Sequence, residues 1–389
     1  MTARGALEGL LVADFSRVLA GPFATMLLGD LGADIVKVER PQGGDETRSW
    51  GPPFLGDQST YYLAVNRNKR SVAIDLKDER GRQAALALAG RADVLVENFK
   101  TGTLERLGLG FERVRQGNPG LVWCSISGFG HGQGADLPGY DFLVQATSGL
   151  MHITGQPGGE PTKVGVALVD VLTGLYATSG ILAALHERAR TGRGQLVEVS
   201  LLGSALASLV NQASSYLCTG RSPRAMGNRH PSITPYETLA TADRPLVVAV
   251  GNDGQFARLC GALGLPDAAA DPRFATNTAR VANREALVAL LEHALAARGA
   301  ADWVAALAEA GVPCGMVNDV GEAFALAERL GLDPVVRAGA VPQVADPIRL
   351  SATPPSYRLG PPALGEHTAE VLRWLGVRPP VDPGAVTPP

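Results

Sequence analysis

Short apolar runs and helical patterns alternate along the first 130 residues, and this alternation limits the fold more strongly than any other feature of the sequence. Apolar runs flanked by turn residues are typical of buried strands, and the segments between them are typical of helices. Crossovers of this kind join parallel strands and cover both faces of the sheet. We therefore expect an α/β fold whose large domain is a Rossmann-like, doubly wound parallel sheet. The predicted strands are Gly9–Ser16, Asp34–Arg40, Ser71–Lys77, Asp93–Phe99 and Leu121–Gly130.

The predicted helices of this region carry boundary signals. The segment Gly21–Gly32 has proline near its start and glycine at its end, which is typical of a helix. The Ala-rich segment Asp78–Ala92 predicts the helix of the next crossover. Parallel sheets bind ligands beyond the carboxyl ends of their strands. A site is therefore expected at the turns Ser16–Pro22, Arg40–Asp45 and Asn98–Gly102.

The segment from Thr173 to Arg190 predicts a deeply buried helix. Its small residues Gly174, Ala177, Gly180 and Ala184 recur at helical spacing. Glycine inside a helix costs about 1 kcal/mol relative to alanine, so we expect the close approach of another backbone to compensate.

The chain is long enough for two domains. The proline-rich stretch Pro342–Pro362 is typical of a long connector, across which we expect few core contacts. The tail after Val377 is also proline-rich, and we expect its end to be disordered. We predict that residues 1–210 form the first part of the large domain, 211–235 a linker, 236–320 a smaller α+β domain, and 321–389 a linker and return to the large domain.

Charge and cysteine spacing exclude several classes of function. The net charge of −3 and the pI near 6.1 lack the basic excess that nucleic acids or anionic membranes require. The four cysteines stand far apart, without a CxxC pair or zinc-like His spacing, which indicates reduced thiols and no metal site. We find no signal-peptide pattern and no apolar run of about 18 residues, so we expect a soluble, cytoplasmic protein.

One acid, Asp170, stands between an apolar run and the predicted buried helix, in the string VGVALVDVLTG. Taken alone it is most simply a helix N-cap, because Asp in that place accepts hydrogen bonds from free backbone N–H groups. The positive end of the helix dipole would keep its carboxylate ionised at neutral pH. The pattern by itself leaves both a capping role and a catalytic role open.

Many segments in a fixed order resemble one known family. Among them are DFSRVLAGPFATMLLGDLGADIVKVERPQGGDETR, NRNKRSVAIDL, GYDFLVQATSGLM, PTKVGVALVDVLTGLYA, RTGRGQLVEVSLLGSAL and LGEHTAEVL. These strings extend over nearly the whole chain and resemble the class III (CaiB/BaiF-type) coenzyme A transferases. The resemblance implies a large domain that binds CoA, CoA thioesters as substrates, no permanently bound cofactor or metal, and an interlocked homodimer. It also implies that Asp170 is a nucleophile that forms a mixed anhydride and then an aspartyl-CoA thioester.

By the same resemblance, ten residues are predicted to bind CoA. Arg40 and Arg106 match positions that contact its phosphates and adenine, although alone they would be solvated surface arginines. Ile74 and Phe99 are also consistent with core positions. The basic run Asn66–Ser71 is predicted to be a solvated turn near the nucleotide end. The full set is Leu19, Ala20, Arg40, Ile74, Lys77, Asn98, Phe99, Lys100, Arg106 and Tyr140.

Two departures from branches of the family narrow the activity. Tyr140 stands at the position where the racemases of this family share a histidine. An unperturbed tyrosine has a pKa of about 10 and is therefore a poor base at neutral pH. The formyl-type enzymes have a His and a Gln in the first turn, and this chain has Arg17 and Leu19 at those positions. They also have a glycine-rich loop over the active site, and this chain has only GNRHPSITPYE instead. The sequence therefore resembles most closely the branch that moves CoA from succinyl-CoA to dicarboxylates such as glutarate, and it disfavours oxalate and formate.

A dicarboxylate that presents one carboxylate to Asp170 needs a cation for the other. Arg17, Arg229 and His230 are the candidates, and a structural hinge or dimer contact is an equal interpretation for the last two. A 2-methylacyl-CoA racemase and a noncatalytic acyl-CoA-binding protein remain as alternatives. A dinucleotide-binding oxidoreductase is disfavoured because the first turn, SRVLAGP, has no G-x-G-x-x-G pattern.

Overall fold

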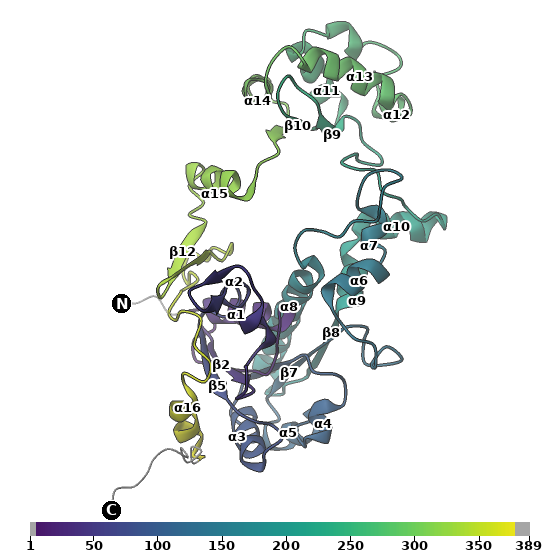
Figure 1. The fold of residues 1–389 in the computed structure, drawn as a ribbon. Coiled ribbons are helices and arrows are strands. Elements are labelled where there is room, and N and C mark those ends of the chain that lie inside the picture. The colour runs from purple at the N-terminus through teal and green to yellow at the C-terminus, as the bar shows by residue number, and fades with distance from the viewer. Residues whose placement is uncertain (1–4, 378–389) are drawn as a thin grey trace, which may run out of the picture. The chain divides into compact units, whose positions relative to one another are not determined.

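The computed structural model describes residues 5–377 and divides them into two compact units (Figure 1). Within the described chain, unit 1 comprises residues 5–150, 163–221 and 333–377, and unit 2 comprises Met151–Thr162 and Ser222–Leu332. The predicted domain borders at 210, 236 and 320 stay a prediction. The proline-rich tail after Val377 lies outside the described residues.

Unit 1 is built on a six-stranded sheet in which neighbouring strands pair in parallel. The chain adds strands from β1 toward one edge and then, starting again beside β1, toward the other edge, as in a doubly wound fold. This confirms the predicted parallel α/β sheet. In order across the sheet the strands are β5 (Lys69–Ala73), β2 (Asp34–Glu39), β1 (Leu11–Asp14), β6 (Val94–Glu97), β7 (Val122–Ser127) and β8 (Leu196–Ser200).

Successive residues of the strands point to opposite faces of the sheet, and both faces are buried. On β6, Val94 and Val96 belong to one core and Leu95 to the other. Parallel strands covered on both sides need apolar residues at consecutive positions, which is why they read as continuous apolar runs in the sequence. Full burial of one such side chain is worth about 1.5–3 kcal/mol.

Helices cover both faces of this sheet (Figure 1). One core includes residues of α1 (Ala20–Asp30), α6 (Asp141–Thr147), α8 (Leu168–Thr191) and α9 (Leu201–Ser208). The other includes residues of α3 (Glu79–Ala89), α4 (Thr103–Arg106), α5 (Phe111–Gly117) and α16 (Thr368–Leu375), so both ends of the described chain share a core. Unit 1 also contains η1 (Glu46–Ser49), β3 (Phe54–Leu55), β4 (Gln58–Ser59), α2 (Thr60–Leu63) and α10 (Val210–Thr219), and α7 (Leu150–Ile153) lies at its border with unit 2.

The 24-residue helix α8 packs tightly against α1, and its glycines explain how. A Cβ on Gly174 would lie 2.7 Å from the carbonyl oxygen of Ala20, and one on Gly180 would lie 2.7 Å from Cγ1 of Val197. These contacts confirm the close approach that the small residues predict. By length and composition alone α8 could span a membrane. Its contacts with α1 and β8 identify it as a core helix of unit 1.

The basic run Asn66–Ser71, predicted to be a solvated turn, is buried instead, with Lys69 0% exposed. Strand β5 begins at Lys69 rather than Ser71, and it ends at Ala73, so the predicted continuation to Lys77 is wrong. Arg67 donates hydrogen bonds to both carboxylate oxygens of Asp30, at 2.6 Å from Nη2 and 2.9 Å from Nε. Because a carboxylate neutralises the guanidinium, the run tolerates burial.

The C-terminal return is fixed to unit 1 by the same run. The side chain of Asn68 accepts the N–H groups of Arg358 (2.7 Å) and Leu359 (3.1 Å) and donates to the carbonyl oxygen of Ser356 (2.7 Å). The stretch Pro342–Pro362, expected to make few contacts, is therefore anchored in a buried network. The stretch begins within β13 (Val341–Val344), which forms a hairpin with β12 (Val335–Ala338).

Unit 2 combines a small antiparallel sheet with helices around a single core. Its strands, in order across the sheet, are β11 (Cys314–Met316), β10 (Leu246–Ala249) and β9 (Tyr236–Leu239). Phe256, Leu291 and Trp303 are among the buried residues between them and the helices. The helices of unit 2 are α11 (Asp253–Ala262), η2 (Pro266–Ala269), α12 (Asn277–Ala282), α13 (Arg284–Leu295), α14 (Ala300–Glu309) and α15 (Val320–Arg329).

Substitution of Gly174 tests the packing of α8 on α1. Because the new Cβ would press on the carbonyl oxygen of Ala20, we expect Gly174→Ala to lower the free energy of unfolding by about 1–3 kcal/mol, measured by urea denaturation. A Cβ on Gly117, at the end of α5, would meet no atom within 4 Å, so Gly117→Ala is the matched control and is expected to be neutral or mildly stabilising. Equal stability of the two variants would contradict the packing described for α8.

Candidate active site

The strand order places a crevice between β1 and β6, where the direction of strand addition reverses. In open parallel sheets, ligands bind at such a point, beyond the carboxyl ends of the strands. The turns that follow these two strands are joined here through their polar groups. The backbone N–H of Arg17 donates to Oδ1 of Asn98 at 2.9 Å, and Nδ2 of Asn98 donates to the carbonyl oxygen of Arg17 at 2.8 Å.

A pocket of about 470 Å³ opens at this crevice and contains Asp170. The turn after β1, the turn after β6 and the loop between β7 and α6 form its walls. Its size is that of a small-molecule site. Of the residues predicted to bind CoA or substrate, it brings together Arg17, Leu19, Ala20, Asn98, Phe99, Lys100 and Tyr140.

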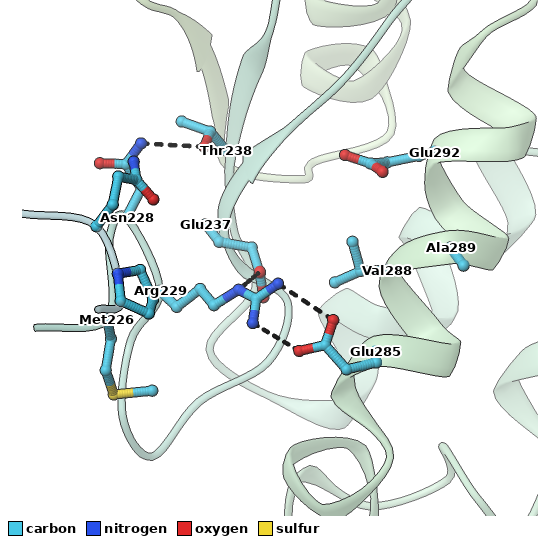
Figure 2. Close-up of a pocket in the computed structure, with 11 residues that line it drawn as sticks. Met226, Asn228, Arg229, Glu237, Thr238, Glu285, Val288, Ala289 and Glu292 are labelled. Carbon is cyan, nitrogen blue, oxygen red and sulfur yellow. Dashed lines mark hydrogen bonds and ion pairs between the residues drawn. The ribbon is translucent and has the colours of Figure 1, made fainter. Parts of the chain in front are cut away.

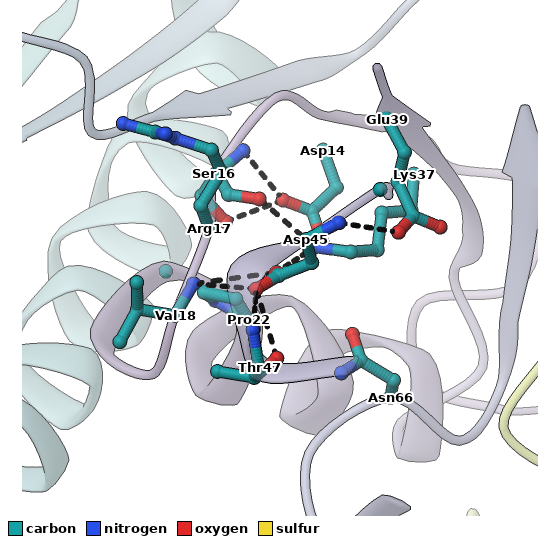
Figure 3. Close-up of polar contacts among 12 residues, drawn as sticks. Asp14, Ser16, Arg17, Val18, Pro22, Lys37, Glu39, Asp45, Thr47 and Asn66 are labelled. Atoms are coloured by element: carbon teal, nitrogen blue, oxygen red, sulfur yellow. Dashed lines mark hydrogen bonds and ion pairs between the residues drawn. The ribbon is translucent and has the colours of Figure 1, made fainter. Parts of the chain in front are cut away.

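The turn after β1 is held in a strained conformation. Val18 has φ of 68°, which a β-branched residue rarely adopts. Its N–H donates to both carboxylate oxygens of Asp45, at 3.3 and 3.2 Å, and Nζ of Lys37 donates to Asp45 and to the carbonyl oxygen of Ser16, each at 2.9 Å (Figure 3). These bonds fix the backbone of the turn, so the pocket wall is shaped before a ligand arrives.

Buried ion pairs lie directly beneath that turn. Nζ of Lys69 is 3.0 Å from Oδ2 of Asp14, and both side chains are 0% exposed. Burial opposes ionisation of Asp14, but the charges of Lys69 and Lys37 outweigh it and lower the pKa of Asp14 to about 2. Burial also lowers the pKa of Lys69 to about 8, against the opposing effect of Asp14. The pairs therefore stay charged at neutral pH and brace the carboxyl edge of the sheet.

Asp170 is in the first turn of α8 and does not cap it. The N-cap position belongs to Ala167, which has no side-chain acceptor. Oδ1 of Asp141 takes that role from the neighbouring helix, accepting the N–H groups of Val169 at 2.8 Å and Asp170 at 3.3 Å. The N-cap interpretation of Asp170 is therefore wrong, and its carboxylate is left to face the pocket.

The helix dipole does not keep Asp170 fully ionised at neutral pH, contrary to what the sequence led us to expect. Burial, with the negative charge of Asp141 added, raises the pKa of Asp170 to about 7. No ion pair within the described residues 5–377 includes Asp170. A half-buried carboxylate with a like charge beside it is a poorly solvated group, and perturbed carboxylates in pockets are typical of catalytic sites.

Two aromatic residues near Asp170 were not predicted from the sequence to belong to the site. Trp50 lines the pocket, and its ring packs edge to face on Tyr61 with the centroids 5.2 Å apart. Burial and the charges of Asp170 and Asp141 raise the pKa of Tyr61 to about 12, so its hydroxyl remains a hydrogen-bond donor. The signal in the sequence was an aromatic cluster in a chain with only 5% aromatic residues.

Four residues predicted to bind CoA lie outside this pocket. Arg40 directly follows β2 and donates from Nε to the carbonyl oxygen of Gly44 at 2.9 Å. Lys77 and Arg106 are exposed, and Arg106 donates to Oγ1 of Thr103 at 3.0 Å. Ile74 is buried and lines a second pocket of about 430 Å³, near Pro41 and Asp78. The structure thus places six of the ten residues predicted to bind CoA in the Asp170 pocket and the other four outside it.

Arg229 and His230 belong to unit 2, where both already have partners. Figure 2 shows Arg229 pointing toward Glu237 and Glu285. Arg229 forms ion pairs with Glu285 at 2.6 Å and Glu237 at 3.3 Å. The ring of His230 packs on Tyr236 with centroids 5.2 Å apart, and its Nδ1 accepts the N–H of Ser232. A substrate carboxylate on Arg229 would compete with Glu285.

Comparison with known proteins places these residues in a family context. Residues 7–368 match the family model described as CoA-transferase family III. The chain is 46% identical to a succinate–glutarate CoA-transferase of Agrobacterium fabrum, over 95% of both chains. It is 43% identical to an acetyl-CoA:oxalate CoA-transferase of Acetobacter aceti, over 95% of this chain and 96% of the relative. A crystal structure of a CaiB/BaiF family protein from Brucella suis is 44% identical, with a TM-score of 0.86 over 96% of this chain and 100% of that one.

Stability at different pH values tests the environment of Asp170. The pKa of Asp170 is about 7 in the folded protein, against 3.8 ordinarily, so only the unfolded chain releases this proton between those values. The protein therefore loses stability as the pH rises from 3.8 to about 7. We expect Asp170→Asn to remove this loss and to be more stable than wild type at pH 8 by on the order of 2 kcal/mol, after solvent screening, with the difference vanishing toward pH 4. Urea denaturation across this range measures the difference, and a constant difference would contradict the raised pKa.

Proposed function

Because the chain belongs to CoA-transferase family III, it is a CoA-transferase, and we propose that it moves CoA from succinyl-CoA to a dicarboxylate such as glutarate. The observation that carries the proposal is the placement of Asp170, a half-buried carboxylate without an ion pair among residues 5–377, in a pocket lined by six of the ten residues predicted to bind CoA. The Agrobacterium relative named for succinate and glutarate supports this donor and acceptor. Another relative is named for oxalate, so oxalate is the acceptor to compare with glutarate.

The first half of the reaction transfers the acyl group to Asp170. A carboxylate oxygen of Asp170 attacks the thioester carbon of succinyl-CoA, the C–S bond breaks, and CoA leaves as a thiolate. The thiolate then attacks the side-chain carbonyl carbon of Asp170 in the mixed anhydride. The bond from that carbon to the bridging oxygen breaks, so succinate leaves with an oxygen that came from Asp170, and an aspartyl-CoA thioester remains.

The second half repeats these steps with the acceptor. A carboxylate oxygen of glutarate attacks the aspartyl carbon, and the CoA thiolate is released again. The thiolate then attacks the glutaryl carbon of the new anhydride, and Asp170 leaves as a carboxylate. Each step exchanges one acyl bond for another, so the free energy of the thioester is kept as long as water does not enter.

The surroundings of Asp170 are suited to this chemistry. A desolvated carboxylate is a stronger nucleophile than a hydrated one, and holding it beside the thioester replaces a bimolecular encounter. The exposed Arg40, Lys77 and Arg106 supply positive charge for the CoA phosphates on a chain whose net charge is −3.

Arg17 is the better supported partner for the second carboxylate of the acceptor. It lines the Asp170 pocket and forms an ion pair with Glu46, and its guanidinium lies over the ring of Phe99 at 5.4 Å. Its Nε is buried without a hydrogen-bond partner among the described residues. A carboxylate ligand would satisfy that donor. Arg229 and His230 remain the second candidates.

Racemisation is the alternative within the family, and Tyr61 argues against it. A racemase needs a second base near Asp170, and the pKa of Tyr61, raised to about 12, makes a phenolate unavailable at neutral pH. Tyr140, in the position of the racemase histidine, is 62% exposed. A noncatalytic acyl-CoA-binding protein is the alternative of another class, and it would have no use for the carboxylate of Asp170.

We also propose that the enzyme is a cytoplasmic, interlocked homodimer. Exposed apolar side chains on α9 and α10 support an interface, among them Leu206, Val210 and Leu217. Light scattering is expected to give twice the 40.5 kDa mass of the chain, and cell fractionation is expected to recover the enzyme in the soluble fraction. A monomeric mass or recovery with membranes would contradict these two proposals.

Replacement of Asp170 tests the nucleophile. We expect Asp170→Asn to lower kcat for transfer from succinyl-CoA to glutarate by about 10³-fold or more, because the amide cannot form the anhydride. The CoA products are separated and quantified chromatographically. The same assay in heavy water, with a 2-methylacyl-CoA, is expected to show no exchange of the C2 hydrogen. Transfer at the wild-type rate would rule out Asp170 as nucleophile, and C2 exchange would favour a racemase.

Replacement of Arg17 tests recognition of the acceptor. Loss of a charged hydrogen bond costs about 1.5–3 kcal/mol, so we expect Arg17→Ala to raise the KM for glutarate at least tenfold. Arg229→Ala is measured in parallel, since the two arginines are competing candidates. The KM for acetate, which has no second carboxylate, is the internal control and should change little. An unchanged KM for glutarate rules out the arginine that was replaced.

A further inference from the structure

The side chain of Asp141, in helix α6, binds the backbone at the start of α8. This residue is the first of α6, and its Oδ1 accepts the N–H groups of Val169 and Asp170 at 2.8 and 3.3 Å. Since the first N–H groups of a helix have no partner within it, Asp141 supplies the acceptor that Ala167 lacks. The backbone that carries the nucleophile is therefore held by a carboxylate from another helix.

Gln145, one turn further along α6, holds Asp141 and the segment before α8 together. Its Nε2 donates to Oδ2 of Asp141 at 2.6 Å and to the carbonyl oxygen of Val166 at 3.4 Å. Its Oε1 accepts the N–H of Val164 at 2.9 Å. Gln145 is 0% exposed, so these bonds are shielded from water. Asp141 and Gln145 thus form a two-residue clamp that fixes the chain on both sides of Ala167.

The clamp also brings a negative charge to the nucleophile. Both carboxylate oxygens of Asp141 accept hydrogen bonds from N–H donors. Its charge disfavours ionisation of Asp170, in addition to burial. The phenol of Tyr61 is the other titratable group that interacts with Asp170. The remaining charged residues of the pocket are Arg17 and Glu46, which pair with each other, and Lys100 and Asp136, which pair at 2.9 Å.

We propose that Asp141, held by Gln145, is the positioning residue of the reaction: it fixes the backbone of Asp170 and disfavours its free carboxylate relative to the uncharged anhydride and thioester. The inference rests on the proposed function. A like charge beside Asp170 destabilises the starting carboxylate, and this penalty disappears once the carboxylate oxygen or carbon is acylated. The charge therefore strengthens attack on the thioester. The hydrogen bonds keep the attacking oxygen in place while the charge acts.

Two variants separate the charge of Asp141 from its hydrogen bonds to the start of α8. Asp141→Asn removes the charge and, because Nδ2 replaces Oδ2, the hydrogen bond from Gln145, but it keeps an oxygen that can accept from Val169 and Asp170. Asp141→Ala removes both. The matched control is Asp93→Asn, a half-buried carboxylate before β6 that accepts the N–H of Leu11 at 2.8 Å and pairs with Arg188. Asp93 precedes its strand, so it lies at the amino edge of the sheet, opposite the pocket.

The first readout is a titration that needs no substrate. Carbon-13 NMR of aspartate-labelled protein, with Asp170→Asn used to assign the resonance, follows the Asp170 carboxyl against pH. We expect Asp141→Asn to lower the pKa of Asp170 by about one unit or more, and Asp93→Asn to leave it unchanged. An unchanged pKa in Asp141→Asn overturns the electrostatic role, whether or not the protein transfers CoA.

The second readout is kinetic. In Asp141→Asn the acid limb of the kcat profile is expected to move to lower pH with the pKa, and the plateau to fall about three- to tenfold because a less basic Asp170 is a weaker nucleophile. Asp141→Ala is expected to lower kcat about 100-fold with little change in the KM for succinyl-CoA. Wild-type kcat in Asp141→Ala overturns the positioning role. Absence of transfer in wild type would instead refute the proposed function, and the titration would still decide the role of Asp141.

Discussion

Desolvation of the Asp170 carboxylate, with no cation paired to it in the described part of the chain, is the constraint on which the site depends. A charged group removed from water is normally paired, because its solvation energy must be replaced. At the same edge of the sheet, Asp14 pairs with Lys69, Asp45 with Lys37 and Glu39 with Arg48. Those cations outweigh burial and lower the pKa of each carboxyl. Asp170 faces a like charge instead, and its pKa is raised.

These two kinds of carboxylate have complementary tasks. The paired ones fix the strained turn at Val18, so that this wall of the pocket holds its shape without a ligand. The unpaired one keeps the reactivity that pairing would remove. The strained turn at Val18 and the poorly solvated carboxylate of Asp170 both destabilise the fold. The two apolar cores, one on each face of the sheet, offset this cost.

The sequence predicted the features that depend on local pattern. Strands buried on both faces gave continuous apolar runs, and the glycines of α8 predicted its close approach to α1, because both signals lie within one segment. The burial of Arg67 and Lys69 was missed, since their partners Asp30 and Asp14 are far away in the chain. The capping interpretation of Asp170 failed for the same reason. Its true acceptor, Asp141, precedes it by 29 residues and comes from another helix. Family resemblance indicated Asp170 as the nucleophile, but only the structure shows the burial and the neighbouring charge of Asp141 that raise its pKa.

Heavy oxygen tests the acylation of Asp170 most directly. Enzyme is incubated with succinyl-CoA and glutarate labelled with oxygen-18 in both carboxylates, and the peptide containing Asp170 is then analysed by mass spectrometry. Because the thiolate cleaves the bond between the glutaryl carbon and the bridging oxygen, Asp170 is expected to gain a heavy oxygen atom from glutarate. Formation of glutaryl-CoA with no heavy oxygen in Asp170 would contradict covalent catalysis at this residue.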